Sequence, residues 1–173
     1  MGEMTSKRGA PSRARGDRRL VAVLGMMGLA LGACAAGCVG EFEEAGGFIG
    51  VVDGQEFTIR SGRAEPVGDG LEIILSDAEG DGCDGGLIEP VGNRKVILSA
   101  NEAAEGRYAT SEGAQISIQI KNDAQVFTSR DATGSFQLEL VELTEGGEVS
   151  GTVSGVSDEG DDLDGSFFVT FCP

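Results

Sequence analysis

The feature of this 173-residue chain that most constrains its fold is the period of two in its apolar residues, from about position 48 onward. In one segment Ile116, Ile118 and Ile120 alternate with polar residues, and in another Val149 and Val153, four positions apart, share a face. Successive side chains of a β-strand point to opposite faces, so this alternation is typical of strands that bury one face. No segment shows a sustained helical period. The chain is therefore expected to be all-β.

Turn signals separate the apolar runs. Asp53-Gly54 lies between two runs, and this dipeptide adopts the positive φ angles that a two-residue hairpin requires. In the C-terminal third, Phe136, Leu138 and Leu140 are expected on one side of a strand. A single helical turn is expected around residues 100–105, capped by the asparagine there.

These segments predict about nine short antiparallel strands. Their expected arrangement is a β-sandwich, either immunoglobulin-like or jelly-roll-like, with a small β-barrel as the alternative. The 29 glycines suit both tight turns and the close approach of strands. Because the chain has one tyrosine and no tryptophan, the core is expected to consist mainly of Val, Ile, Leu and Phe.

The N-terminal segment has the layout of a secretory signal peptide. Residues 1–19 contain six basic and two acidic side chains, and residues 20–33 contain no charged side chain. The apolar stretch is shorter than the roughly 20 residues of a transmembrane helix and ends in small residues, as a cleavage site requires. Residues 1–33 are therefore expected to be a signal peptide rather than a buried helix.

The end of this segment carries a second signal. Leu31-Gly32-Ala33-Cys34 resembles the lipobox of bacterial lipoproteins, in which an aliphatic residue and two small residues precede the modified cysteine. The resemblance implies cleavage before Cys34, a diacylglycerol thioether on its sulfur and acylation of its new amine. Several acyl chains anchor a protein more firmly than a single chain. Cys38, after Ala35-Ala36-Gly37, is the alternative site but lacks the aliphatic residue.

The chain after the signal divides into two parts. Residues 34–47 are small, acidic and turn-rich and are expected to form a flexible tether, followed by an all-β domain over 48–173. That domain resembles small all-β bacterial lipoproteins of unknown function in its hairpin from Gly50 to Phe57, its mid-chain cysteine and its last strand from Gly165 to Cys172. The lipoprotein resemblance implies a cell-envelope location. Ala35, in place of an aspartate that retains some lipoproteins at the inner membrane, favours the outer membrane.

Cys83 and Cys172 are the two cysteines of the expected domain. An exported protein reaches a compartment in which disulfides form, and two cysteines allow one pairing. A disulfide is therefore expected, with two free thiols as the alternative. If Cys34 is lipidated, Cys38 has no partner, and this odd count is the argument for Cys38 as the anchor.

Charge excludes several classes of partner. Residues 34–173 contain seven basic and 27 acidic side chains, a formal net charge of −20. Nucleic acids and anionic lipid surfaces require Lys and Arg, so neither is an expected partner. Basic partners and divalent cations are electrostatically permitted, and solubility alone also accounts for the charge. The expected membrane contact is the lipid anchor, and the sequence names no protein or ligand partner.

Catalysis is not expected. The chain has no histidine, which excludes Ser-His-Asp and Cys-His catalysis and a histidine-containing zinc site. A glycoside hydrolase needs two carboxylates at a set separation, and the many acids here are not specific for that arrangement. A hydrolase that uses carboxylates alone is therefore the least favoured function.

One acidic loop resembles a calcium site. Asp77, Glu79 and Asp81 occupy alternate positions before a glycine, as in the first half of an oxygen-ligand calcium loop, and Asp84 could add a ligand. The position of the bidentate glutamate is Ile88 instead. A second loop offers further acids: Asp158, Asp161, Asp162 and Asp164. Both loops also fit solvated turns that protect strand edges.

The leading functional expectation is an exported, lipid-anchored envelope protein whose β-domain binds or supports without catalysis. The alternative from another class is a calcium-dependent adhesion or ligand-binding module. Apart from calcium, no cofactor is expected.

Overall fold

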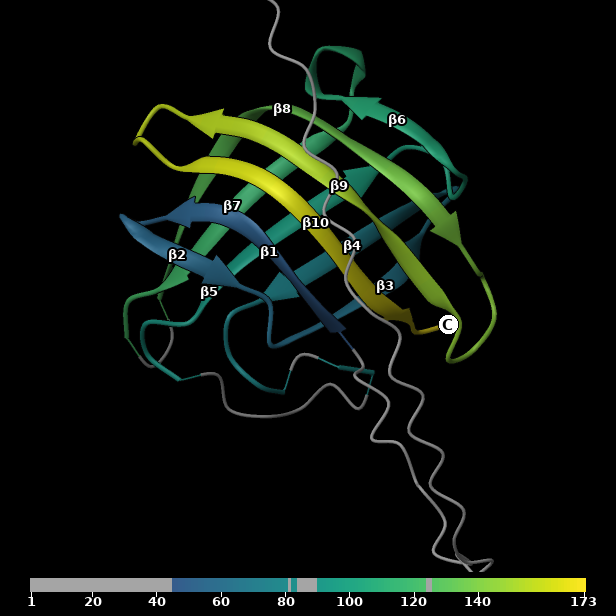
Figure 1. Ribbon diagram of the computed structural model, residues 1–173, viewed down its shortest axis with the longest axis horizontal. Helices are drawn as coiled ribbons and strands as arrows, with labels where there is room; N and C mark the ends of the chain where they lie inside the picture. The colour runs from purple at the N-terminus through teal and green to yellow at the C-terminus, as the bar shows by residue number, and fades with distance from the viewer. Residues whose placement is uncertain (1–44, 81, 84–89, 124–125) are drawn as a thin grey trace, which may run out of the picture. The chain divides into compact units, whose positions relative to one another are not determined.

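The computed structural model describes residues 45–80, 82–83, 90–123 and 126–173. These residues lie in one compact unit and form ten strands and a short 3-10 helix, η1 (Figure 1). The elements are β1 (Ala45–Val52), β2 (Gln55–Thr58), β3 (Ser61–Val67), β4 (Gly70–Ser76), β5 (Arg94–Ala100), β6 (Gly106–Ala109), η1 (Thr110–Glu112), β7 (Gln115–Lys121), β8 (Phe127–Val141), β9 (Glu148–Ser157) and β10 (Asp162–Phe171). The all-β prediction is confirmed.

The ten strands form one sheet whose pairings close on themselves. The order runs β2-β1-β10-β3-β4-β5-β7-β8-β6, and β9 lies between β10 and β8. Strands adjacent in this order are antiparallel except β10 and β3, which are parallel over two residue pairs. Consecutive strands are mostly neighbours, and this order is consistent with both predicted arrangements, the β-sandwich and the small barrel.

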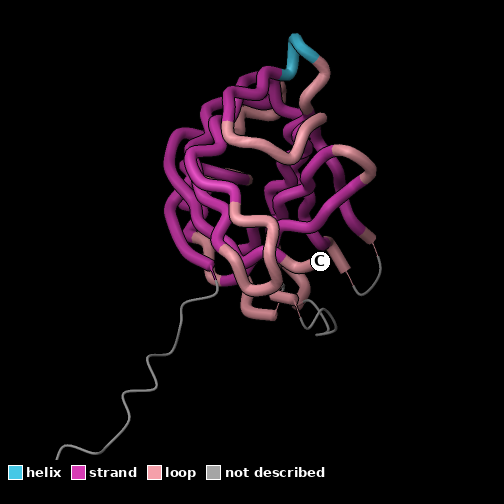
Figure 2. Tube along the Cα trace, turned by 90° about the vertical axis from the view of Figure 1, so that its right-hand side faces the viewer, coloured by secondary structure: helices cyan, strands magenta, loops and turns pink. Residues whose placement is uncertain are grey.

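The closed sheet is flattened into two layers with the core between them. In Figure 1, β9 and β10 pass in front of β4 and β5, and Figure 2 shows the layers from the side. The most buried large side chains come from both layers, so one apolar core holds them together. They include Ile49, Phe57, Leu71, Ile73, Leu75, Leu98, Ile116, Ile118, Phe136, Leu138 and Leu163.

The alternation read from the sequence appears directly in the burial of two strands. On β7, Ile116, Ile118 and Ile120 are all buried, as expected. On β9, buried and more exposed residues alternate along its length, and Val149 and Val153 face the core. Buried apolar surface is the main favourable contribution to folding, so these alternate residues fix the register of their strands.

The expectation for Leu140 is wrong. Phe136 and Leu138 are buried in the core, but the pairing of β8 with β9 shifts between Leu138 and Leu140. A β-bulge adds one residue to one strand and therefore reverses the faces beyond it. Val141, one residue later, packs against the core in place of Leu140.

Strand β1 includes three residues that precede the expected start of the domain. Ala45, Gly46 and Gly47, assigned to the tether by sequence, belong to β1. Gly47 has a φ of +131°, and a Cβ there would lie 2.2 Å from the backbone oxygen of Ser166. The glycines that suggested flexibility therefore allow β1 to approach β10 closely.

Three other segments differ from the expectation. Strand β3 carries no clear alternation and was not expected, and β8 extends nine residues before Phe136, to Phe127. Residues 101–105 are bends rather than a helical turn, and the only helix among the described residues is η1. The Tyr108 hydroxyl donates to the carbonyl oxygens of Glu102 and Ala104, which holds that segment in its non-helical path. Within the described ranges, no helix has the length and apolar character of a membrane span.

Candidate functional site

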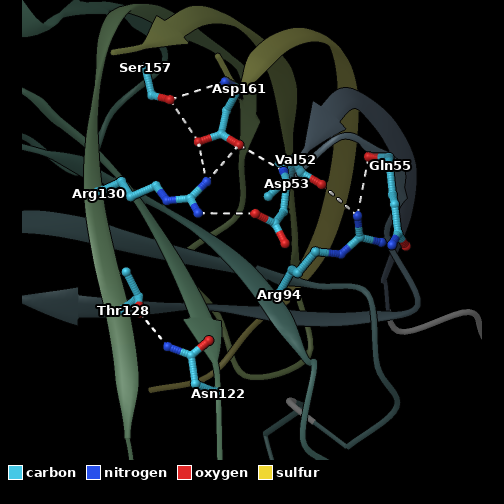
Figure 3. Close-up of polar contacts among 9 residues, drawn as sticks. All are labelled: Val52, Asp53, Gln55, Arg94, Asn122, Thr128, Arg130, Ser157 and Asp161. Carbon is cyan, nitrogen blue, oxygen red and sulfur yellow. Dashed lines mark hydrogen bonds and ion pairs between the residues drawn. The ribbon is translucent and has the colours of Figure 1, made fainter. Parts of the chain in front are cut away.

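The best-defined polar site surrounds the β1–β2 hairpin. Asp53 and Gly54 form its turn with φ angles of 54° and 72°, the left-handed pair that a type I′ turn requires. The hairpin predicted from this dipeptide is therefore confirmed. Two arginines, Arg94 from β5 and Arg130 from β8, hold the hairpin from different strands (Figure 3).

Arg130 contacts the hairpin through a buried carboxylate. Its guanidinium donates to both oxygens of Asp161, at 3.2 and 3.3 Å, and to Asp53 Oδ1 at 3.0 Å. The Asp161 carboxylate also accepts the Asp53 backbone N–H at 2.8 Å and the Ser157 hydroxyl at 2.7 Å (Figure 3). The β9–β10 turn and the β1–β2 turn are thus joined through a single carboxylate.

The electrostatics of this cluster follow from those contacts. Burial raises the pKa of Asp161, but the donors from Asp53, Ser157 and Arg130 outweigh it and hold the pKa below its ordinary value. The hydrogen bond to Asp53 raises the pKa of Arg130, more than burial lowers it. A buried charge is costly without partners, and this carboxylate has a hydrogen-bonded cation and two neutral donors.

Arg94 supports the other side of the hairpin. Its guanidinium donates to the carbonyl oxygens of Val52 at 2.8 Å, Gln55 at 3.2 Å and Glu56 at 3.0 Å. It also lies 5.7 Å from the centre of the Phe57 ring, within the range of a cation–π contact. Its Nε donates to Asp77 Oδ2 at 2.6 Å. Arg94 therefore joins the hairpin to the end of β4 and covers a fully buried aromatic ring.

Chemically, this arrangement fixes structure. Each charged group at its centre has a partner within the chain, and the cluster contains neither a thiol nor an imidazole. The arginine roles were missed in the sequence because their partners are far away, with Val52 42 positions from Arg94 and Asp53 77 positions from Arg130. The sequence held one indirect signal, which is the scarcity of basic residues. Residues 34–173 contain seven basic side chains, and Arg94 and Arg130, at or within strands, are two of them.

The predicted calcium loop is described only in part. Both oxygens of Asp77 accept from Arg94, because Oδ1 accepts its backbone N–H at 2.8 Å. Glu79 is exposed, and Asp81 and Asp84 lie outside the described residues. In the second loop, Asp161 is the buried partner of Arg130, and Asp158, Asp162 and Asp164 are exposed. Over the described ranges, no group of three or more His, Cys, Asp or Glu side chains is placed to hold a metal ion.

The predicted disulfide is present. Cys83 and Cys172 are bonded, with their Cα atoms 5.4 Å apart and 89 positions between them in the sequence. The bond joins the β4–β5 connection to the residue that follows β10. The candidate lipidation sites, Cys34 and Cys38, lie outside the described residues.

Two surface cavities lie near η1. The first, of about 480 Å³, has a floor of Ala114, Ile116 and Ala132, and Asp131 is the acidic side chain of its described lining. The second, of about 270 Å³, is lined by Tyr108 and by three glutamates, Glu102, Glu105 and Glu112, among others. Burial raises the pKa of Tyr108, and its hydroxyl already donates to two carbonyl oxygens. This tyrosine is therefore committed to holding the neighbouring loop.

Comparisons of the chain with protein-family models, with curated proteins and with solved structures found no match.

Proposed function

We propose that this chain is exported and lipid-anchored at Cys34, and that its β-domain acts at the cell envelope as a non-catalytic binding or structural module. The observation that carries the proposal is Leu31-Gly32-Ala33-Cys34, placed at the end of an uncharged segment that follows six basic side chains. The spacing of charge, apolar run and cysteine is the pattern of a lipid-modified signal peptide.

The disulfide supports export. Structural disulfides are common in exported proteins and rare in reducing cytosols, and Cys83–Cys172 is a pair of distant residues joined within the folded domain. The ten residues between Cys34 and Ala45, where β1 begins, also suit a short tether. Fully extended, such a segment spans at most about 36 Å, so an anchored domain would stay close to the membrane surface.

A non-catalytic role is supported by the use of the polar groups. The most buried charged cluster is occupied in holding the β1–β2 hairpin, through Arg94, Arg130 and Asp161. With no histidine in the chain, Ser-His-Asp and Cys-His catalysis are excluded, and the hydrolytic alternative weighed from the sequence is a pair of carboxylates. The strongly acidic surface favours a basic partner over an anionic one. We place the anchored protein at the outer membrane, on the sequence that follows Cys34.

The decisive experiment is lipid labelling in a bacterial host that processes lipoproteins. Cells that express the full chain are fed radiolabelled palmitate, and the protein is compared with its Cys34→Ser and Cys38→Ser variants. The proposal predicts label in the wild type and in Cys38→Ser, and loss of label with retention of the uncleaved chain in Cys34→Ser.

The matched cysteine variant identifies the anchor. Label lost in Cys38→Ser but kept in Cys34→Ser would move the anchor to the second cysteine. A wild-type chain that never incorporates palmitate, or that stays intact in the cytosol, would refute lipid anchoring altogether. Separation of inner and outer membranes on a density gradient then tests the location, with the outer-membrane fraction expected to contain the protein.

A further inference from the structure

The sheet closes in part through one short junction, between β10 and β3. Its pairing consists of Thr170 with Arg63 and Phe171 with Ala64. Every other pair of neighbouring strands has at least three such residue pairs, and β10 has nine with β9. The junction is also the one parallel pairing among the described strands, and parallel pairs are slightly weaker per residue.

The disulfide lies at this junction. Cys172 directly follows Phe171, and its backbone N–H donates to the Ala64 carbonyl oxygen at 2.7 Å. Cys83 belongs to the connection that leaves β4, the antiparallel partner of β3. The bond therefore links the strand on one side of the junction to the chain segment on the other side.

The apolar residues at this junction are buried. Ala64 is fully buried, and Phe171 and Cys172 are 5% and 9% exposed. On its other side, Phe171 is held by the β8–β9 connection, because its N–H donates to the Gly147 oxygen at 2.7 Å and its carbonyl accepts from Gly146 at 3.2 Å. The segment that follows β10 contacts β3 through the hydrogen bond from Cys172 to Ala64. This is the contact with β3 that depends most directly on the disulfide.

From this geometry we propose that Cys83–Cys172 is a redox-sensitive latch that keeps the β3–β10 junction closed. Reduction opens the junction locally and uncovers Ala64 and Phe171, and the rest of the sheet stays folded. Local openings start where few backbone pairings hold two segments together, as at this junction of two residue pairs. The inference concerns the folded domain and does not depend on lipidation of Cys34.

The chemical step is thiol–disulfide exchange with a dithiol. One thiolate of the reductant attacks a sulfur of the bond and forms a mixed disulfide, and its second thiol then resolves that intermediate. The products are two protein thiols and one cyclic oxidised reductant, so two electrons pass from the dithiol to the protein. Reoxidation by an oxidised dithiol of the same class reverses the step.

The test is native-state hydrogen exchange of the full-length protein, resolved by residue, with and without excess dithiothreitol. The amides of Cys172, Val169 and Val153 are followed at increasing concentrations of urea below the unfolding transition. In the reduced protein, the amide of Cys172 is expected to exchange at least tenfold faster than that of Val169. Its exchange is also expected to be nearly independent of urea, because a local opening exposes little surface.

Two controls make the outcome decisive. The Cys83→Ser/Cys172→Ser double variant, measured without reductant, must reproduce the pattern of the reduced wild type at position 172. Reoxidation of the wild type must restore slow exchange there. Exchange at Cys172 with the same urea dependence as Val153, unchanged exchange at Cys172 after reduction, or complete unfolding on reduction would each overturn the local latch.

Discussion

At the scale of single residues, Asp161 shows how an acidic surface loop can contribute to the fold. The sequence places it among exposed neighbours, yet its side chain is 1% exposed and its charge is balanced by Arg130. Removal of either member of a buried ion pair typically costs about 3–5 kcal/mol, because the other charge is left without compensation. Asp161 is therefore expected to be the acidic residue of the described part whose loss damages folding most.

The first prediction concerns the pH dependence of stability. The pKa of Asp161 is lowered from its ordinary value of 3.8, so its contribution is complete above that pH and is lost as the pH falls through the lower folded-state pKa. Urea unfolding of Asp161→Asn at neutral pH is expected to show a loss of about 3 kcal/mol. Below about pH 4 the difference from the wild type should shrink, because the carboxyl of the unfolded chain then binds a proton before the folded carboxyl, with its lower pKa, does.

Asp164→Asn is the matched control, since Asp164 is an exposed acid close by on β10. Its unfolding free energy should stay within about 0.5 kcal/mol of the wild type at neutral pH, as is usual for surface substitutions. Equal losses in the two variants, or a difference for Asp161→Asn that persists unchanged into acid, would contradict the role assigned to the buried carboxylate.

Residue-scale prediction from sequence succeeded where few alternatives existed. Cys83 and Cys172 allowed one pairing, and that pairing is present. The partners of Arg94 and Arg130 were not predictable, because they lie 17 to 77 positions away. Three of those of Arg94 are also backbone carbonyls, which carry no sequence pattern. Asp77 was read as a cation ligand for the same reason, since its sequence does not reveal Arg94 beside it.

At the scale of strands, two elements share the sequence Gly-Ser-Phe and use it in the same way. A Cβ on Gly134 of β8 would lie 2.1 Å from the Ser154 oxygen, and one on Gly165 of β10 would lie 1.9 Å from the Phe48 oxygen. The following phenylalanines, Phe136 and Phe167, are 2% and 3% exposed. In each strand, a glycine allows close contact with a neighbouring backbone, and an aromatic ring enters the core two residues later.

The second prediction therefore concerns Gly165→Ala. A methyl group there meets a backbone oxygen that cannot move without separating β1 from β10, and overpacking of this kind costs about 1–3 kcal/mol. We expect a loss of about 2 kcal/mol or more in urea unfolding, together with faster hydrogen exchange in β1.

Gly155→Ala on β9 provides the comparison, because the nearest atom to its Cβ would be the Thr133 oxygen at 3.1 Å. Its loss should be less than half that of Gly165→Ala. The explanation from backbone contact fails if the two alanine variants are equally stable, or if exchange in β1 is unaffected by Gly165→Ala.

Strand prediction worked where alternation was long and regular, as in β7 and β9. It failed for β3, whose sequence SGRAEPV contains a glycine, a proline and two charged residues. This strand is set by its antiparallel pairing with β4, over seven residue pairs, rather than by its own pattern. The bulge at Leu138–Leu140 was likewise invisible, because a bulge depends on the partner strand as much as on the strand itself.

At the scale of the whole molecule, charge opposes folding. Residues 45–173 contain 24 acidic and seven basic side chains, a net charge of −17. Three of the basic residues, Arg63, Arg94 and Arg130, form ion pairs with acids of the same domain. Self-repulsion of this kind destabilises a compact state and is screened by salt.

The third prediction separates screening from specific cation binding. Raising NaCl from about 10 to about 150 mM is expected to raise Tm by a few degrees, because the Debye length falls to about 8 Å. At matched ionic strength, CaCl2 should raise Tm by the same amount, since both Asp77 oxygens already accept from Arg94. A larger rise with calcium that disappears in Glu79→Gln would support the calcium-binding alternative instead.

Closure of the sheet also affects how neighbouring copies of the domain interact at high local density. The two strands at the ends of the described strand order, β2 and β6, are four residues long, and Arg94 occupies two carbonyl oxygens of β2. Long bare edges are what allow neighbouring molecules to stack into fibrils. Many copies of such a domain can therefore lie next to one another at high local density without pairing their strands into a shared sheet.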